Sequence, residues 1–133
     1  SVMCIRDRPA ALRKGAYVLP TIFSDVSNDM IIAQEEIFGP VLCIIPYQNI
    51  QQAIELANET PFGLSSAVFA ADQAAAIKIA SKLRAGQCYI QGALFNTDSP
   101  FGGYKQSGNG REWGIEGLKE YTETKAMLIN AAD

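Results

Sequence analysis

Two adjacent carboxylates, an aromatic residue and a Gly-Pro turn make residues 35–40 the most informative short segment of the sequence. The segment reads Glu-Glu-Ile-Phe-Gly-Pro and immediately precedes an apolar run. Paired carboxylates can bind polar ligands or move protons in a functional site. They can equally be surface acids that accompany a core phenylalanine. The residues by themselves leave both interpretations open.

Cys88 is the second side chain that could do chemistry, because a thiolate is a strong nucleophile. It follows Ala85-Gly86-Gln87 in an apolar segment that is expected to form a strand. No histidine or cationic residue stands beside it in the sequence to stabilise a thiolate. We therefore expect Cys88 to be a buried structural cysteine and not a nucleophile.

A glycine pattern at residues 108–114 resembles the fingerprint of dinucleotide-binding loops. Gly108, Gly110 and Gly114 are spaced as GxGxxxG, which is one residue longer than the fingerprint requires. The pattern also follows a long loop instead of a strand, so the geometry that holds a phosphate is not expected. We interpret these glycines as a glycine-rich start of a helix.

The sequence contains no histidine, which excludes Ser-His-Asp and Cys-His catalysis and histidine-dependent zinc sites within these residues. The net charge is −3 and the basic residues are scattered, so no nucleic-acid surface is expected. Cys4, Cys43 and Cys88 are odd in number and far apart, which predicts free thiols in a reducing cytoplasm. No apolar stretch approaches the ~20 residues of a membrane span, and no signal-peptide pattern opens the sequence.

The first half of the chain alternates strand and helix patterns. The length of 133 residues and the 48% hydrophobic content suit one domain with a conventional core. Residues 1–20 show no clear period, as if the chain entered mid-domain, and residues 17–23 predict an edge strand or irregular extension around Pro20. Residues 41–45 predict a strand buried on both faces. Residues 50–57 predict a helix that is capped by Asn49, with Gln52 reaching back to the cap.

The second half continues this alternation and then changes character. A strand is expected over residues 65–70, and a helix follows that Asp72 caps and that buries Ala76, Ile77, Ala80 and Leu83. Residues 87–91 predict a third strand. Short links between these elements predict right-handed crossovers and an α/β fold with a mostly parallel open sheet and flanking helices. The prediction ends with a glycine-rich loop over residues 92–110, a helix over residues 112–120 and an apolar strand over residues 124–129.

Two long motifs in this order resemble the NAD(P)-dependent aldehyde dehydrogenase superfamily. They are Glu-Glu-Ile-Phe-Gly-Pro-Val at residues 35–41 and Ser-Pro-Phe-Gly-Gly-Tyr-Lys-Gln-Ser-Gly at residues 99–108, which continues through Gly-Arg-Glu at residues 110–112. Pro-Phe-Gly-Leu at residues 61–64 and Ala-Gly at residues 85–86 fit the family order, and the resemblance runs from about Gly15 to Met127. It implies that residues 1–123 are the C-terminal part of the catalytic domain. Residues 124–133 would then be a C-terminal oligomerisation strand and tail.

The resemblance also implies roles for five side chains. Glu36 matches a glutamate that binds the ribose hydroxyls of the nicotinamide half of the cofactor. Phe38 matches an aromatic residue that packs beside the nicotinamide. Phe95 and Phe101 match aromatic residues that line the aldehyde channel. Glu112 matches a glutamate that relays a proton from the general base, although an acid placed near a helix N-terminus is an equal alternative.

The implied activity is oxidation of an aldehyde to a carboxylic acid with NAD or NADP. In that reaction a thiolate attacks the carbonyl, hydride passes to the cofactor, and water hydrolyses the thioester. The family's nucleophile follows a Gly-Gln-x-Cys motif that is not found here, since Gly86-Gln87-Cys88 lacks the intervening residue. The chain alone is therefore expected to be inactive. The resemblance further implies a homo-oligomer, a dimer or tetramer, joined through the C-terminal strand. The composition predicts a cytoplasmic location with no metal, nucleic-acid or membrane partner.

Two alternatives remain open from the sequence. The chain could be a non-catalytic α/β binding or assembly module, although such a module would not need Glu36 and Phe38 together with Phe95 and Phe101. The parent enzyme could also be an aldehyde dehydrogenase that releases its thioester to coenzyme A. The identity of the aldehyde and the choice between NAD and NADP are not encoded in these motifs.

Overall fold

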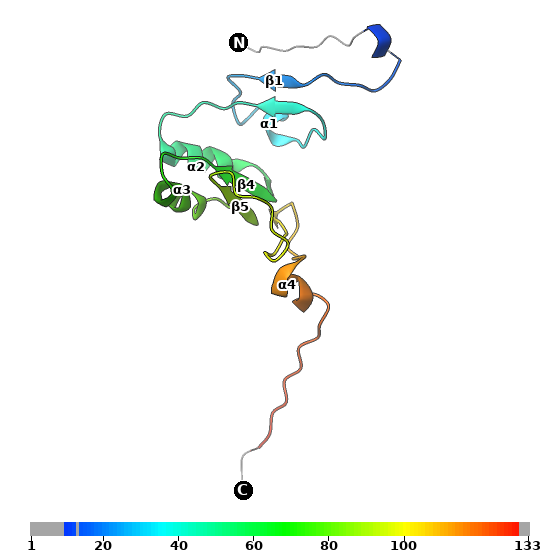
Figure 1. Cartoon of the computed structure of the whole chain (residues 1–133), viewed down its shortest axis with the longest axis vertical. Helices are drawn as coiled ribbons and strands as arrows, with labels where there is room; N and C mark the ends of the chain where they lie inside the picture. The colour runs from blue at the N-terminus through cyan, green and yellow to red at the C-terminus, as the bar shows by residue number, and fades with distance from the viewer. Residues whose placement is uncertain (1–9, 13, 131–133) are drawn as a thin grey trace. The chain divides into compact units, whose positions relative to one another are not determined.

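The computed structural model describes residues 10–12 and 14–130 (Figure 1). Residues 1–9 and 13 of the irregular start expected over residues 1–20 lie outside the described residues, and Cys4 is one of them. The chain divides into two compact units, one ending at Pro61 and the other beginning at Phe62.

The first unit contains a two-stranded parallel sheet and two helices. The strands β1 (Thr21–Phe23) and β2 (Val41–Cys43) are joined through the short helix α1 (Ile31–Gln34), and helix α2 (Ile50–Glu59) follows β2. The 3-10 turn η1 (Ala10–Leu12) precedes them. Thr21 pairs with Val41 and Phe23 with Cys43. Val26 and Ile54 are the buried hydrophobic side chains of this unit among the described residues.

Helix α2 begins where its cap predicts. The Asn49 side chain accepts a hydrogen bond of 2.9 Å from the Gln52 N–H group. The Gln52 side chain reaches back one residue further than expected, because its Oε1 accepts from the Gln48 N–H group at 2.6 Å and not from Asn49. The helix ends at Glu59, since Pro61 disfavours helical geometry at Thr60.

The polar turn after β1 is anchored to α2. Asn28 Nδ2 donates to the Leu56 carbonyl at 3.0 Å and to Glu59 Oε2 at 2.8 Å. Within the turn, the Ser27 hydroxyl donates to the Asp29 carboxylate, and this bond together with a backbone hydrogen bond lowers the pKa of Asp29. This stabilising contribution is present above the unfolded pKa and is lost as the pH falls through the lowered pKa.

The second unit is built around a strand–helix–strand unit. Strands β4 (Ser65–Val68) and β5 (Gln87–Ile90) pair in parallel, with Ser65 opposite Gln87 and Val68 opposite Ile90, and helix α3 (Gln73–Ala80) connects them. Strands β3 (Phe62–Gly63) and β6 (Tyr104–Lys105) form a short antiparallel pair, and helix α4 spans Gly114–Lys119. Val68 and Ala76 are its buried hydrophobic side chains among the described residues.

Helix α3 confirms the predicted cap and corrects the predicted face. Asp72 accepts a hydrogen bond of 2.8 Å from the Ala75 N–H group, and Ala76 is fully buried. Ile77 was expected to face inward, but its side chain is 50% exposed, because it lies about 100° around the helix from Ala76. The helix ends at Ala80, so Leu83 lies beyond it and is half-buried.

The α/β class is confirmed, but the expected single sheet is wrong for this chain. The described residues form three two-stranded sheets, of which two are parallel and one is antiparallel. One parallel pair, β1–β2, lies in the first unit, and the other, β4–β5, lies in the second unit. The strand expected over residues 41–45 ends at Cys43 and is not buried on both faces, because Leu42 is 56% exposed. Strand β6, inside the expected loop, was not predicted.

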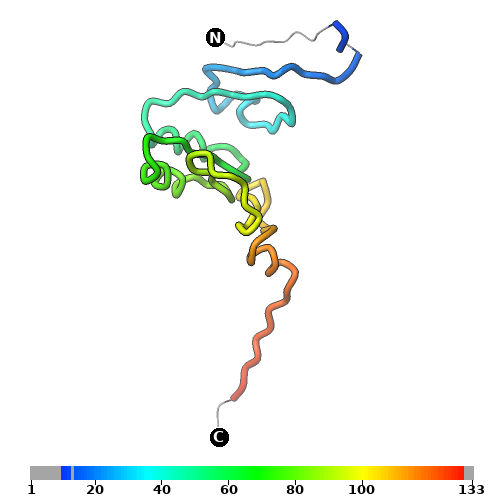
Figure 2. Tube along the Cα trace, viewed as in Figure 1, coloured from blue at the N-terminus to red at the C-terminus, as the bar shows by residue number. Residues whose placement is uncertain are grey.

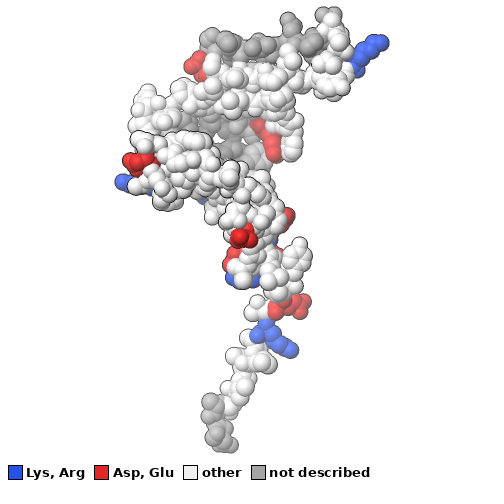
Figure 3. Space-filling model, in the orientation of Figure 1, with Lys and Arg blue, Asp and Glu red and all other residues white. Residues whose placement is uncertain are grey.

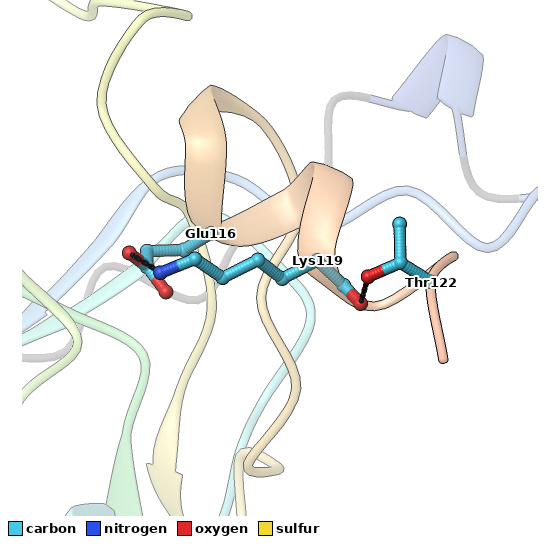
Figure 4. Close-up of polar contacts among 3 residues, drawn as sticks. All are labelled: Glu116, Lys119 and Thr122. Carbon is cyan, nitrogen blue, oxygen red and sulfur yellow. Dashed lines mark hydrogen bonds and ion pairs between the residues drawn. The ribbon is translucent and has the colours of Figure 1, made fainter. Parts of the chain in front are cut away.

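The segment after α4 carries no regular structure among the described residues. The helix closes with a salt bridge of 2.7 Å between Lys119 and Glu116, and the Thr122 hydroxyl donates to the Lys119 carbonyl at 2.9 Å (Figure 4). Beyond it the tube shows no helical turn (Figure 2). Residues 124–129 were expected to form a strand but pair with no strand here. A strand needs a partner for its backbone groups, and Leu128 is 97% exposed.

On the face drawn in Figure 3, acidic and basic side chains are interspersed among uncharged ones. No helix of the described residues is long and apolar enough to cross a membrane.

The cap at Asp72 gives a stability prediction. Asp72→Ala removes the acceptor for an otherwise unpaired helix N–H group and should lower the free energy of unfolding by about 1 kcal/mol in urea titrations. Asp72→Asn keeps an acceptor and should retain most of the stability. Gln73→Ala, at the adjacent exposed position, is the matched control and should stay within about 0.5 kcal/mol of the parent. Equal losses for all three variants would contradict the capping role.

Candidate functional site

Glu36 and Phe38 lie on the connection between α1 and β2. Helix α1 ends at Gln34, and the N–H group of the next residue, Glu35, donates a hydrogen bond of 3.0 Å to the Ile31 carbonyl. Phe38 then adopts a left-handed backbone with φ +44°, which is uncommon for a bulky residue and marks a constrained turn. The Phe38 side chain is 90% exposed, and Glu36 is exposed as well. Among the described residues, no hydrogen bond or ion pair engages the Glu36 carboxylate.

A hollow of about 340 Å³ lies beside this connection. Its walls come from α1, from the turn and from β2, and include Ile32, Glu35, Phe38, Val41 and Cys43. Cys43 Sγ donates to the Ile32 carbonyl at 3.5 Å, so this thiol is engaged across the hollow. The structure therefore places Phe38 at the hollow. Glu36, one of the two predicted cofactor residues, is not among the residues that line it.

The two predicted channel residues of the second unit come together through a third aromatic residue. The rings of Phe95 and Trp113 are 4.8 Å apart at 89°, and those of Phe101 and Trp113 are 4.9 Å apart at 36°. These three residues are called the aromatic cluster below. Sequence reasoning missed Trp113, although it is the single tryptophan of the sequence and directly follows the Gly-Arg-Glu motif.

The backbone of Glu112 is fixed by hydrogen bonds, whereas its side chain extends outward. Its N–H group donates to the Phe101 carbonyl at 2.7 Å, and the Phe101 N–H group donates to the Glu112 carbonyl at 2.8 Å. The side chain is exposed. The helix expected from Glu112 begins two residues later, at Gly114, and Glu116 is the acid in its first turn. Glu112 directly precedes the N-cap residue Trp113, so both interpretations of this acid, as a proton relay or as a charge near a helix N-terminus, stay open.

Arg111 holds the glycine-rich loop closed. Its guanidinium Nη1 donates to the carbonyls of Gly103, Asn109 and Gly110 at 3.0, 3.2 and 2.8 Å. The same group lies over the ring of Tyr104, 5.4 Å from its centroid. The loop thus directs carbonyl oxygens at a cation, whereas a phosphate cradle directs N–H groups at an anion. Of the glycine pattern, only Gly114 begins α4, whereas Gly108 and Gly110 lie in the loop before it.

Cys88 lies on β5 and is half-buried, so the expected full burial is wrong in degree. It is paired in register with Ser66 and lines a hollow of about 430 Å³ together with Leu94, Asn96 and Ser99. In the part of the chain that the structure describes, no group of three or more histidine, cysteine, aspartate or glutamate side chains could hold a metal ion.

The model of the aldehyde dehydrogenase family matches residues 2–127. The chain belongs to this family.

Individual relatives show the same likeness. The chain is 50% identical to 3-succinoylsemialdehyde-pyridine dehydrogenase from Pseudomonas sp. over 121 residues, which is 91% of this chain and 25% of the relative. It is 48% identical to a putative aldehyde dehydrogenase of Staphylococcus saprophyticus over 90% of this chain and 25% of the relative. The chain thus spans about a quarter of the length of the curated relatives it matches.

Solved structures agree with the sequence comparison. The aldehyde dehydrogenase of Mycobacterium tuberculosis in complex with NAD⁺ matches 92% of this chain and 26% of its own, with a TM-score of 0.86 and 48% identity. A mutant of aldehyde dehydrogenase C from Pseudomonas syringae, in complex with NAD⁺ and octanal, matches 96% of this chain and 26% of its own. Its TM-score is 0.88 and its identity 48%.

The surroundings of Cys88 predict an unreactive thiol. Under native conditions, iodoacetamide should alkylate Cys88 no faster than a model thiol, because no histidine exists in the sequence and β5 supplies no cationic neighbour. Cys43, which is also half-buried, is the matched control. Peptide mass spectrometry over time separates the two sites. Alkylation of Cys88 markedly faster than that of the model thiol would identify it as an activated nucleophile and contradict the prediction.

Proposed function

We propose that the complete polypeptide of which this chain is part oxidises an aldehyde to a carboxylic acid with NAD⁺ or NADP⁺. The observation that carries the proposal is membership of the aldehyde dehydrogenase family over residues 2–127. The chain is proposed to be the C-terminal part of the catalytic domain, with residues 124–133 as an oligomerisation strand and tail. The nucleophilic cysteine lies outside this chain, which supplies contacts and has no activity by itself.

The connection between α1 and β2 is proposed as the cofactor contact. The exposed Glu36 carboxylate, unengaged among the described residues, fits two vicinal ribose hydroxyls, because one carboxylate can accept from both. The exposed Phe38 ring, on its constrained turn, offers a flat apolar face for a nicotinamide. The cofactor, when bound, supplies the hydride acceptor. NAD⁺ is the first cofactor to test, since two related structures contain it.

The second unit is proposed to face the aldehyde. Phe95 and Phe101 line the channel, and their apolar rings favour an uncharged carbonyl compound over water. Glu112 is held by its backbone bonds to Phe101, so that its exposed carboxylate stays close to the channel residues. In that place it can receive a proton from the general base and pass it to solvent.

The proposed ribose contact predicts a kinetic effect of Glu36→Gln in the complete enzyme. The apparent KM for the cofactor should rise and hydride transfer should slow, because the loss of a charge-assisted hydrogen bond costs roughly 1.5–3 kcal/mol. Steady-state rates of cofactor reduction, measured with cofactor and aldehyde each varied, provide the test.

A carboxylate outside this connection supplies the control for this experiment. Glu55→Gln removes the same charge at an exposed position of α2 and should leave the cofactor KM within about twofold of the parent value. If Glu36→Gln and the parent enzyme have the same kinetics, Glu36 does not belong to the site. If no aldehyde is oxidised with either cofactor, the proposed activity itself is wrong.

The apolar segment over residues 124–129 predicts a subunit contact. Met127, Leu128 and Ile129 are each more than four-fifths exposed, and an unpaired extended segment of this kind can pair with another chain. Deletion of the residues after Thr124 should shift the complete enzyme to a smaller oligomer in sedimentation velocity. Replacing the charged Glu123 and Lys125 with alanine is the control and should leave the oligomer intact. An unchanged sedimentation coefficient after the deletion would refute the contact.

A further inference from the structure

Trp113 connects the two channel residues. Phe95 meets the indole edge-on and Phe101 meets it at a tilt, with centroid distances of 4.8 and 4.9 Å. Among the described residues, no ring contact joins Phe95 directly to Phe101. Aromatic pairs of these geometries are mutually stabilising. The relative placement of the two phenylalanines therefore depends on the indole between them.

The backbone of Trp113 is held in an unfavourable conformation. Its φ of +59° lies in the left-handed region, which a bulky residue keeps only when its surroundings fix it. The hydrogen bonds between Phe101 and Glu112 fix the residue before it, and the Gly117 N–H group donates to the Trp113 carbonyl at 2.9 Å. Because the fold maintains this unfavourable backbone conformation at Trp113, the position of the Trp113 ring has a role.

The loop that carries Phe95 is fixed against Trp113 at its far end. A Cβ atom at Gly114 would lie 2.7 Å from the Asp98 carbonyl oxygen, so only glycine lets the loop approach this closely. The φ of Gly114, +57°, also favours glycine. The loop therefore passes directly beside the residue that follows Trp113.

The near end of the same loop is fixed by a side-chain amide. Gln91 Nε2 donates to the Ala70 carbonyl at 2.8 Å, and Gln91 Oε1 accepts from the Ala70 N–H group at 3.2 Å. These two bonds extend the β4–β5 ladder beyond its last strand pair. The direction in which the chain leaves β5 toward Phe95 is thereby set.

The chemistry of the exposed surface indicates what it can bind. Phe95 is 53% exposed and Trp113 is 37% exposed, and Leu94 beside them is 90% exposed. No lysine or arginine lies between residues 85 and 104, so an anionic tail finds no partner in this segment. Flat aromatic faces with an adjacent aliphatic side chain favour a neutral apolar group that is larger than a short alkyl chain.

We propose that Trp113 is a specificity-determining positioning residue, which holds Phe95 and Phe101 as one wall that selects aldehydes with a bulky, neutral apolar tail. The inference rests on the proposed function of the complete enzyme and adds the substrate class. Trp113 acts through the two phenylalanines and takes no part in the chemical steps.

The test compares kcat/KM for hexanal and propanal in the complete enzyme. Trp113→Leu should lower kcat/KM for hexanal by about tenfold, mainly through KM, and for propanal by less than about threefold. Trp113→Phe should restore most of the preference for hexanal. Tyr121→Leu, which removes an aromatic ring that is 87% exposed outside the cluster, is the control and should change neither value. Equal losses for both aldehydes, or no loss, would overturn the proposal.

Three further measurements make every outcome decisive. Binding of the unreactive acids hexanoate and propanoate, measured by calorimetry, should show the same selective loss in Trp113→Leu, and its absence would overturn the inference. If no aldehyde is turned over, the proposed function fails, and the acid-binding ratio decides the inference alone.

If Trp113→Leu does not fold, Phe95→Leu must show the selective loss. A preference of the parent enzyme for a trimethylammonium aldehyde over hexanal would assign the wall to cations instead.

Discussion

The Arg111 guanidinium is the interaction on which the second unit depends. By binding three carbonyl oxygens of the glycine-rich loop, it turns a segment rich in flexible residues into a closed structure. The closed loop places strand β6 beside β3 and brings Phe101 opposite Glu112. Trp113 follows Glu112 directly, so the position of the aromatic cluster depends on the closed loop that Arg111 holds. An Arg111→Lys change would keep the charge but lose the planar group that reaches several carbonyls at once.

The distribution of apolar side chains explains why the described residues form small sheets. Only four hydrophobic side chains are buried among them, whereas many large ones, including Ile22 and Leu42 on one face of the β1–β2 pair, are about half exposed. Parallel sheets normally carry helices on both faces. The apolar runs from which buried strands were predicted contain side chains that need other residues to cover them. The described residues do not provide this cover for one another. The same reasoning applies to the exposed Met127–Ile129 segment, whose backbone pairs with no strand among the residues that the structure describes.

Local signals were predictable from the sequence, and contacts between distant residues were not. The caps at Asn49 and Asp72 depend on residues three positions apart, so their side chains and the helices they begin could be predicted almost to the residue. The division into separate sheets and the pairing of β6 depend on non-local contacts that a periodic pattern does not encode. Trp113 was missed for the same reason, because its importance lies in two rings that are twelve and eighteen residues away. The predicted cofactor and channel roles came from motif resemblance, and their contacts with ligands stay predictions.

The arrangement of both parallel pairs has a consequence for how the chain folds. Strands β1 and β2 are closed by residues 24–40, and strands β4 and β5 by residues 69–86, each through its own short helix. Because the entropy of closing a loop grows only with the logarithm of its length, such short closures are the least costly way to form parallel pairs. Low contact order of this kind accompanies fast folding. Each strand–helix–strand unit can therefore form during synthesis, soon after its second strand leaves the ribosome. It needs no contacts with residues that are synthesised later.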